Sequence, residues 1–293
     1  SEGTFTFAAT GTDTVLVSGT VGNTQAVKVV NVAPAAGVTA TFADAYEAVT
    51  TNHTGTGTVA FSGTATGIIK IEGGGTVTGA EDITGTVDNT SGTDGSGTLT
   101  MAATKDVSGA IGATNSLLAV NSDSTGGTSA FGGAISATTV SLAGTGTTTF
   151  AGDVTGAVNF TADGTATVAQ AIKIVGAVTT ATTNTGTLNF NETENTTVFA
   201  RSTIGAADKL LKVVSATTEA SDTGTFTGNV YATTINATSV GVIAFGGTVN
   251  ATTLNLLGSA STTFADDVAA AVVFGAGAST TGTATVAANK KIV

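Results

Sequence analysis

Phenylalanine returns along this chain at intervals of 19 residues. The residues that carry the interval are Phe42 and Phe61, Phe131 and Phe150, and Phe226, Phe245 and Phe264. A segment of 19 residues is too short to bury an apolar face by itself, so a chain that repeats it must use the neighbouring copies as its core. The interval therefore predicts a fold that grows in one direction by repetition.

The local pattern within each repeat predicts strands. In "TVNATTLNL" (248–256) and "TTVSLAG" (138–144) apolar residues alternate with Thr, Ser or Asn, and Gly or Asn stands at the ends. This period of two is typical of half-buried strands. We expect an all-β protein, a β-solenoid (β-helix) with coils of about 19 residues, in which the seven phenylalanines stack as core ladders. It would be an elongated rod with little or no helix, and only 42–49 and 206–214 have a pattern that suits a turn or two of helix.

A longer repeat suggests how the chain is organised. The segment 131–160 matches 245–274 at a constant offset of 114 residues, which is six times 19. We predict an irregular β-solenoid part over 1–130 and a regular part over 131–293, or one continuous domain.

Composition restricts the classes of function. The chain of 293 residues has 41% hydrophobic and 10% charged residues, 40 Gly, one His and no Cys or Trp, with a net charge of -11. The apolar content is sufficient for an ordered fold, and the acidic charge argues against nucleic acid or an anionic membrane as a partner. No run is long enough for a membrane helix, so no membrane insertion is expected. The sequence begins at Ser1, which fits removal of a signal peptide, and we expect an extracellular or cell-surface protein.

Three phrases carry a resemblance to known surface proteins: "TFAGDVTGAVNF" (149–160), "TGTFTGNVYATTINA" (223–237) and "IAFGGTVNATTLNL" (243–256). They resemble the passenger repeats of bacterial autotransporters, particularly the rickettsial surface antigens, and the Thr- and Gly-rich repeats of S-layer proteins. The resemblance lies in composition and rhythm, and it implies an exposed β-helical surface protein without designating any functional residue.

The residues that could support catalysis are few. His53, in "TTNHTGTG", is the only imidazole, and no G-x-S-x-G motif accompanies it. We interpret His53 as a residue of a surface turn and expect no enzyme and no catalytic residue.

Acidic residues are paired in "AEDI" (80–83), "NETEN" (191–195) and "ADDV" (265–268), and paired carboxylates are ligands that Ca²⁺ prefers. Asp153 and Asp267 occupy the same position in the long repeat, which favours a solvated corner. The nonapeptide of calcium-binding β-rolls is missing. We predict no cofactor, with Ca²⁺ at one such corner as the alternative.

Lysine recurs in one apolar context, with Lys173 and Lys212 as examples. Alternation in a strand would direct these lysines to solvent, and a covalent link to Asn or Asp is the alternative. Sequons that would accept glycans on an exterior protein begin at Asn52, Asn89, Asn159, Asn191, Asn195, Asn236 and Asn250.

The two ends of the sequence suggest self-association. The chain ends at Val293 within its repeated phrase, and an open solenoid presents unpaired strand edges. We expect a head-to-tail homopolymer whose interface comprises Thr4, Phe5, Thr6, Phe7, Lys291, Ile292 and Val293.

Three classes of function follow from these observations. The first is a structural extracellular protein that assembles itself into a filament or surface layer. The second is an adhesin or passenger rod that displays the segments 89–97 and 121–129. The third is an ice-binding solenoid, in which the Ala-Thr-Thr triplets at 137–139, 232–234 and 251–253 align hydroxyl groups.

Overall fold

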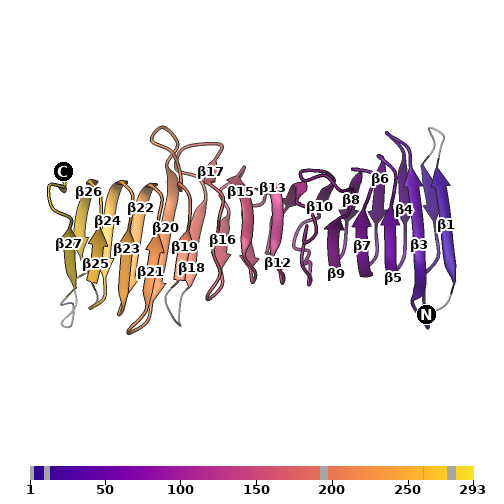
Figure 1. Ribbon diagram of the computed structural model, residues 1–293, viewed down its shortest axis with the longest axis horizontal. Coiled ribbons are helices and arrows are strands. Elements are labelled where there is room, and N and C mark those ends of the chain that lie inside the picture. Colours follow the sequence, from indigo (N-terminus) through magenta and orange to yellow (C-terminus); the bar gives the residue numbers. More distant parts are fainter. Residues whose placement is uncertain (1–2, 10–13, 192–196, 260, 276–281) are drawn as a thin grey trace. The chain divides into compact units, whose positions relative to one another are not determined.

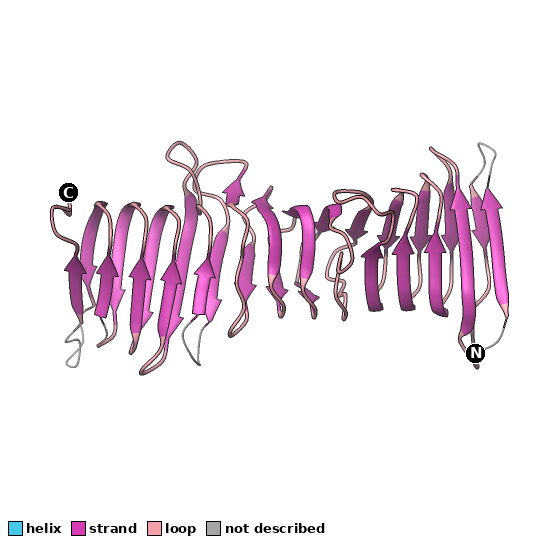
Figure 2. Ribbon diagram, in the orientation of Figure 1, coloured by secondary structure: helices cyan, strands magenta, loops and turns pink. Residues whose placement is uncertain are grey.

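A computed structural model describes residues 3–9, 14–191, 197–259, 261–275 and 282–293. The chain forms two compact units, Ser1–Gly146 and Thr147–Val293. In the described ranges the regular structure is entirely β, and every pairing between strands is parallel (Figures 1 and 2).

The described part of unit 1 contains thirteen strands in coils that hydrogen-bond to their neighbours. One sheet has the order β1-β3-β5-β7-β9, and a second contains β2-β4-β6-β8-β10-β11-β13. The strands are β1 (Thr4–Ala9), β2 (Val15–Val17), β3 (Val27–Pro34), β4 (Thr39–Phe42), β5 (Tyr46–His53), β6 (Thr58–Phe61), β7 (Ala65–Ile71), β8 (Thr76–Gly79), β9 (Ile83–Asn89), β10 (Thr98–Met101), β11 (Leu117–Ser122), β12 (Thr128–Phe131) and β13 (Ile135–Leu142).

Unit 2 has the same construction. Its sheets contain β15-β17, β14-β16-β18-β20-β22-β24-β26 and β19-β21-β23-β25-β27. The strands are β14 (Thr147–Phe150), β15 (Val154–Phe160), β16 (Thr165–Val168), β17 (Val178–Thr180), β18 (Thr187–Asn191), β19 (Thr197–Ala200), β20 (Leu211–Thr218), β21 (Thr223–Phe226), β22 (Val230–Ser239), β23 (Val242–Phe245), β24 (Val249–Leu257), β25 (Ser261–Phe264), β26 (Val268–Phe274) and β27 (Thr283–Val286).

Each unit is therefore a β-solenoid, as the repeat predicts. Phe226 pairs with Phe245 and Phe245 with Phe264, so one coil here has the length of the phenylalanine interval. Coil length nevertheless varies, because the coil from Thr147 to its partner Thr165 is shorter and the coil from Thr187 to its partner Val213 is much longer. The extra residues lie in the turns, and the ladders of paired strands continue past them.

The core consists of inward side chains stacked from coil to coil. All seven phenylalanines of the repeated interval are buried. The rings of Phe226 and Phe245 lie 5.1 Å apart at 9°, those of Phe245 and Phe264 lie 5.3 Å apart at 6°, and those of Phe42 and Phe61 lie 5.5 Å apart at 17°. Such offset stacks add to the free energy gained by burying apolar area. Phe131 and Phe150 are buried within their own units.

Two glycines allow a bend within the long strands of unit 1. Gly67 has a φ of +126° and Gly85 a φ of +143°, values that residues with a Cβ rarely adopt. A Cβ at Gly67 would lie 1.7 Å from the carbonyl oxygen of Ala48, and one at Gly85 would lie 1.9 Å from that of Gly67. The backbones of successive coils approach so closely here that only glycine fits.

The long sequence repeat is out of phase with the coils. Phe150 and Phe264 correspond in the sequence repeat, yet Phe150 pairs with Val168 on β14 and β16, whereas Phe264 pairs with Phe245 on β25 and β23. These are different sheets of unit 2. The repeat therefore preserves a strand and turn pattern, and it does not preserve the position around the coil.

The two segments with a helix-like pattern form no helix. Residues 42–49 contain the end of β4 and the beginning of β5. Residues 206–214 contain a tight turn, closed by the pairing of Ala206 with Lys209, and the first half of β20. The helical expectation for both segments was wrong, because the pairing of each coil with its neighbours overrides a weak local preference.

Candidate functional site

His53 lies in the core of unit 1. Its exposed fraction is 0%, and it pairs with Val32 on one side and Ile71 on the other. Its Nε2 lies 3.1 Å from the carbonyl oxygen of Gly57, and its Nδ1 has no partner among the described residues. Burial lowers the pKa of His53 below its usual value. The interpretation of His53 as a surface-turn residue was therefore wrong.

The acidic corners connect successive coils. An Asp or Asn directly before an inward Val or Ile accepts the backbone N–H of the residue at the equivalent position of the next coil. The pairs are Asp82 with Asp106 at 3.0 Å, Asp106 with Ala130 at 2.6 Å, Asp153 with Lys173 at 3.1 Å, Asn229 with Thr248 at 2.9 Å and Asp267 with Lys291 at 3.1 Å. These side chains satisfy amides at corners, where the regular strand pairing stops.

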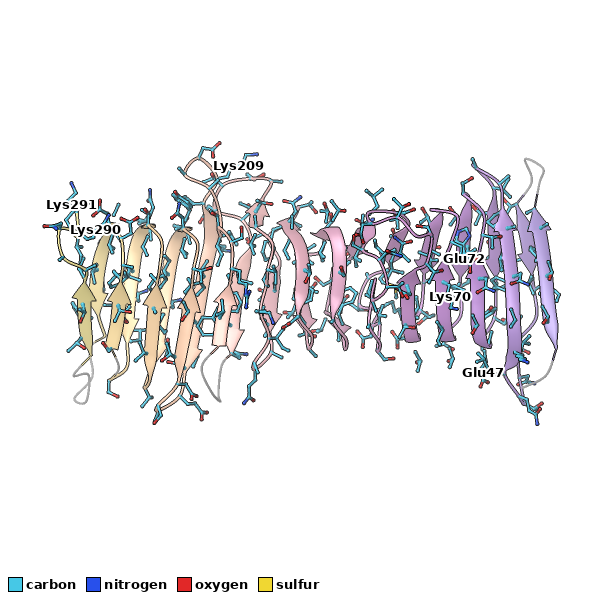
Figure 3. The ribbon with its side chains drawn as sticks, in the orientation of Figure 1. Glu47, Lys70, Glu72, Lys209, Lys290 and Lys291 are labelled. Atoms are coloured by element: carbon cyan, nitrogen blue, oxygen red, sulfur yellow. The ribbon has the colours of Figure 1, made fainter. Side chains whose placement is uncertain are left out.

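Ion pairs follow the same corners. Lys105 binds Glu81 at 2.5 Å, Lys290 binds Asp266 at 2.6 Å, and Lys173 binds Asp153. The hydrogen bond from Lys290 lowers the pKa of Asp266. Figure 3 shows Lys290 and Lys291 beside each other after the last strand. These groups are partly exposed, so each pair contributes little to stability by itself.

This geometry gives the acidic pairs and lysines a structural use. The corner carboxylates are bound to amides and to lysine, and no three acidic or His side chains gather as a metal site in the part of the chain that the structure describes. Lys212 points outward, as alternation predicts, and binds Asp163 at 2.7 Å. Of "NETEN", residues 192–195 lie outside the described residues, as does the sequon at Asn195.

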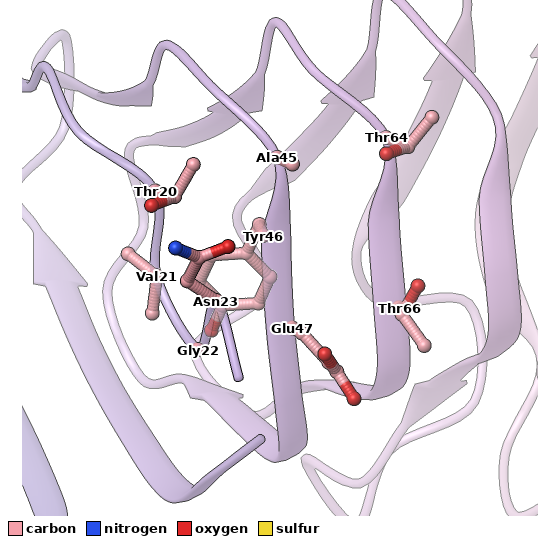
Figure 4. Close-up of a pocket in the computed structure, with 9 residues that line it drawn as sticks. All are labelled: Thr20, Val21, Gly22, Asn23, Ala45, Tyr46, Glu47, Thr64 and Thr66. Carbon is pink, nitrogen blue, oxygen red and sulfur yellow. The ribbon is translucent and has the colours of Figure 1, made fainter. Parts of the chain in front are cut away.

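A hollow of about 190 Å³ lies beside Val21, which bridges to Tyr46 (Figure 4). Thr20, Asn23, Thr64 and Thr66 contribute polar groups, and Glu47 contributes a carboxylate. The Tyr46 ring packs against Phe42 and Phe61, its hydroxyl lies 2.5 Å from that of Thr51, and burial raises its pKa. Glu47 is exposed and is the one carboxylate among these lining residues.

Several sequon asparagines use their amide groups within the fold. Asn52 donates to Asn31 at 2.9 Å, Asn236 donates to Ser215 at 3.3 Å, and buried Asn89 donates to the carbonyl oxygens of Thr93 and Ser116. A glycan would be attached to that same nitrogen. Among the described sequon asparagines, Asn159, Asn191 and Asn250 show no such donation.

The segments proposed for display are largely part of the solenoid. Asn89 holds the turn 89–97 through Thr93 and Ser91. The segment 121–129 contains the end of β11 and the start of β12, so it is an ordinary turn between strands. The turn before β10 is longer than the equivalent turn between β7 and β8, and its extra residues are held by the hydrogen bonds of Asn89.

The predicted interface residues lie at strand edges. Thr4, Phe5, Thr6 and Phe7 belong to β1, which among the described residues pairs only with β3. In the described part of unit 2, β26 pairs only with β24, Ile292 bridges to Val268, and the N–H of Val293 donates to the carbonyl oxygen of Val268. Exposed fractions are 41% for Phe5, 43% for Ile292 and 69% for Val293.

No helix of the described residues is long and apolar enough to cross a membrane. Comparison with protein-family models, with curated proteins and with solved structures gives no match.

Proposed function

We propose that this chain is a structural, non-enzymatic protein of the cell exterior whose copies join head to tail into a filament or surface layer. The observation that carries the proposal is the pair of strand edges, one at β1 in unit 1 and one at β26 in unit 2. Among the described residues, β1 presents backbone N–H and C=O groups along its outer side, and β26 does so only beyond Ala270, because Val268 and Ala270 bond to residues 291–293. Such an edge is a template for another strand.

Apolar side chains at these edges support the proposal. Phe5 pairs with Val30, which is fully buried, so Phe5 occupies an inward position of the same ladder. Phe274 likewise pairs with Leu256 on β24. Phe5 and Phe274 keep exposed fractions of 41% and 54% because no further described coil covers them. A second copy would bury both rings.

The parallel pairing determines the kind of assembly. Because the described strands pair in parallel, the β1 edge differs from the β26 edge, and joining them gives a heterologous contact. Such contacts propagate as open polymers unless the geometry closes a ring.

Light scattering and negative-stain imaging of the full chain test this proposal. We expect polymers from the intact chain, and loss of polymers after deletion of 290–293 or after Thr6→Pro, which removes an N–H donor on the side of β1 that faces away from β3. Circular dichroism should show an unchanged fold in both variants. Equal polymerisation of all three proteins, or of none, would exclude the junction.

A display rod is the second candidate. The supporting observation is the long connection between β18 and β20, which leaves room for the turn at Ala206–Lys209 and for exposed Arg201. Figure 1 shows long loops beside β17 and β20. Isolated particles in the imaging experiment, with no polymer under any condition, would favour this adhesin-like function.

A further inference from the structure

Threonine forms two parallel files on the outer face of one sheet of unit 1. The sheet pairs β4, β6, β8, β10, β11 and β13, and the residues of each file are direct partners across it. The first file contains Thr39, Thr58, Thr76, Thr98, Ala119 and Thr139. The second contains Thr41, Ala60, Thr78, Thr100, Asn121 and Ser141. The hydroxyl-bearing residues of both files together are called the threonine array.

The residues of this threonine array are partly exposed. In both files they alternate along each strand with fully buried neighbours such as Val59 and Val77. Asn121 donates to the hydroxyl of Thr100 at 3.1 Å. Within the described residues, no other hydroxyl of the array has a side-chain or backbone partner.

The array carries no charge and no aromatic ring. Its margins are also small and neutral at three central strands, with Gly57, Gly75 and Gly97 before β6, β8 and β10, and Ala80 and Ala102 after β8 and β10. The other sheet of the same unit differs, because its outward positions include Asp88 and the two residues Glu47 and Lys70 that Figure 3 labels. The neutral surface is therefore confined to one face.

Unit 2 has the same pattern over three strands, β14, β16 and β18, where Thr147, Thr165 and Thr187 form one file and Thr149 pairs with Thr167 in the other. Along the rest of that sheet, amides replace the hydroxyls. There Asn255 donates to Asn236 at 2.8 Å, and Asn236 donates to Ser215. These amides satisfy one another along the sheet, whereas most hydroxyls of the threonine array remain free to bind water.

The Ala-Thr-Thr triplets align only in part. Thr234 pairs with Thr253, but Thr139 pairs with Ala119. Apart from Thr139, the threonine array consists of residues outside those triplets. The array is therefore a different surface from the one that the triplets suggested.

The spacing of the array suggests its ligand. Strands in a sheet lie about 4.8 Å apart and alternate residues of a strand about 6.6 Å apart, and both repeats are similar to those of hexagonal ice. Branching at Cβ restricts the threonine rotamers, so hydroxyl and methyl groups keep this spacing. Ordered waters bridge hydroxyls at small entropic cost. We propose that the threonine array binds the surface of ice crystals through such a water layer.

Uptake of the protein into growing ice tests this proposal directly. A fluorescently labelled chain is mixed with growing ice, and the fraction taken up is compared with that of a labelled globular control protein. We expect enrichment of the wild type and thermal hysteresis in the same solution. Thr76→Lys and Thr78→Lys place a long charged side chain in the middle of the array and should each abolish uptake.

Thr84→Lys is the matched control. Thr84 is exposed on β9, in the same unit but outside the array, and its variant should partition as the wild type does. Circular dichroism checks that all variants fold. Exclusion of the wild type from ice, equal uptake of Thr76→Lys, or equal loss in Thr84→Lys would each overturn the proposal. So would binding to microcrystalline cellulose without any affinity for ice.

Discussion

Oδ1 of Asp82 accepts the backbone N–H of Asp106 at 3.0 Å, although the two residues lie in different coils. Asp106 in turn accepts the N–H of Ala130 at 2.6 Å. Aspartate thus connects three consecutive coils at the same corner, each time directly before an inward side chain. The corner is where a solenoid would otherwise leave amides without partners.

Replacing Asp82 by Ala should lower the free energy of unfolding by about 1 kcal/mol, the usual contribution of a hydrogen bond. Asp82→Asn keeps a side-chain oxygen and should remain near the wild type, as Asn229 shows for an equivalent corner. Urea denaturation measures both. If the Asn variant were as unstable as the Ala variant, charge rather than the hydrogen bond would be responsible.

Replacing Phe245 by Asp should unfold the neighbouring coils. Phe245 is 1% exposed and stacks between Phe226 and Phe264, and a buried unpaired charge costs several kcal/mol. Phe245→Ala should cost about 3–5 kcal/mol through loss of contacts and the remaining cavity. Thermal melting is the measurement. Phe274→Asp, at a ring 54% exposed, serves as the control and should melt close to the wild type.

The stability of unit 1 should depend on pH through His53. Burial lowers the pKa of His53 in the folded state below the ordinary value of 6.5. At a pH between these two pKa values the unfolded chain binds more protons than the folded chain, so the free energy of unfolding rises with pH. The contribution of His53 to stability is therefore complete above about pH 6.5. It is lost progressively as the pH falls towards the pKa of the folded state. His53→Leu should remove this part of the pH dependence. Denaturation series at several pH values would show it, and parallel curves for both proteins would exclude His53 as the cause.

Replacing Gly85 by Ala should destabilise unit 1 strongly. The new Cβ would lie 1.9 Å from the carbonyl oxygen of Gly67, at a φ of +143°. Neither coil can move without disturbing its own pairing. Gly19→Ala is the control, because nothing lies within 4 Å of its added Cβ and its φ is not in the left-handed region. Similar melting temperatures for the two variants would contradict the close approach of the coils.

The sequence predicts the fold because its strongest pattern, the 19-residue phenylalanine interval, also determines the coil length. Phe226, Phe245 and Phe264 are separated by one coil length, and the alternation around them identifies the inward face. Coil length elsewhere could not be predicted, because the polar turns that shorten or lengthen a coil carry no apolar pattern. For that reason Phe150 and Phe264 match in sequence but lie in different sheets.

The local chemistry was predicted less well. His53 stands among polar residues, and its burial follows from its pairing with Val32 and Ile71, which belong to other coils. Two patterns in the sequence indicate these local features. One is the recurrence of Asp or Asn before Val or Ile, as at 82–83 and 267–268, which marks the corners. The other is the series "TATF", "TVTG" and "TLTM", whose outer residues make the threonine array.

The unequal coil lengths have a practical consequence for protein engineering. Since the long coil between Thr187 and Val213 preserves the same parallel pairing as the short coil between Thr147 and Thr165, the turn at Ala206–Lys209 is a suitable place to graft a foreign peptide. The paired strands would act as a fixed frame, and the grafted segment would project from a position determined by the strands on either side. Loop exchange could then alter what the chain presents while the stacked phenylalanines stay in place.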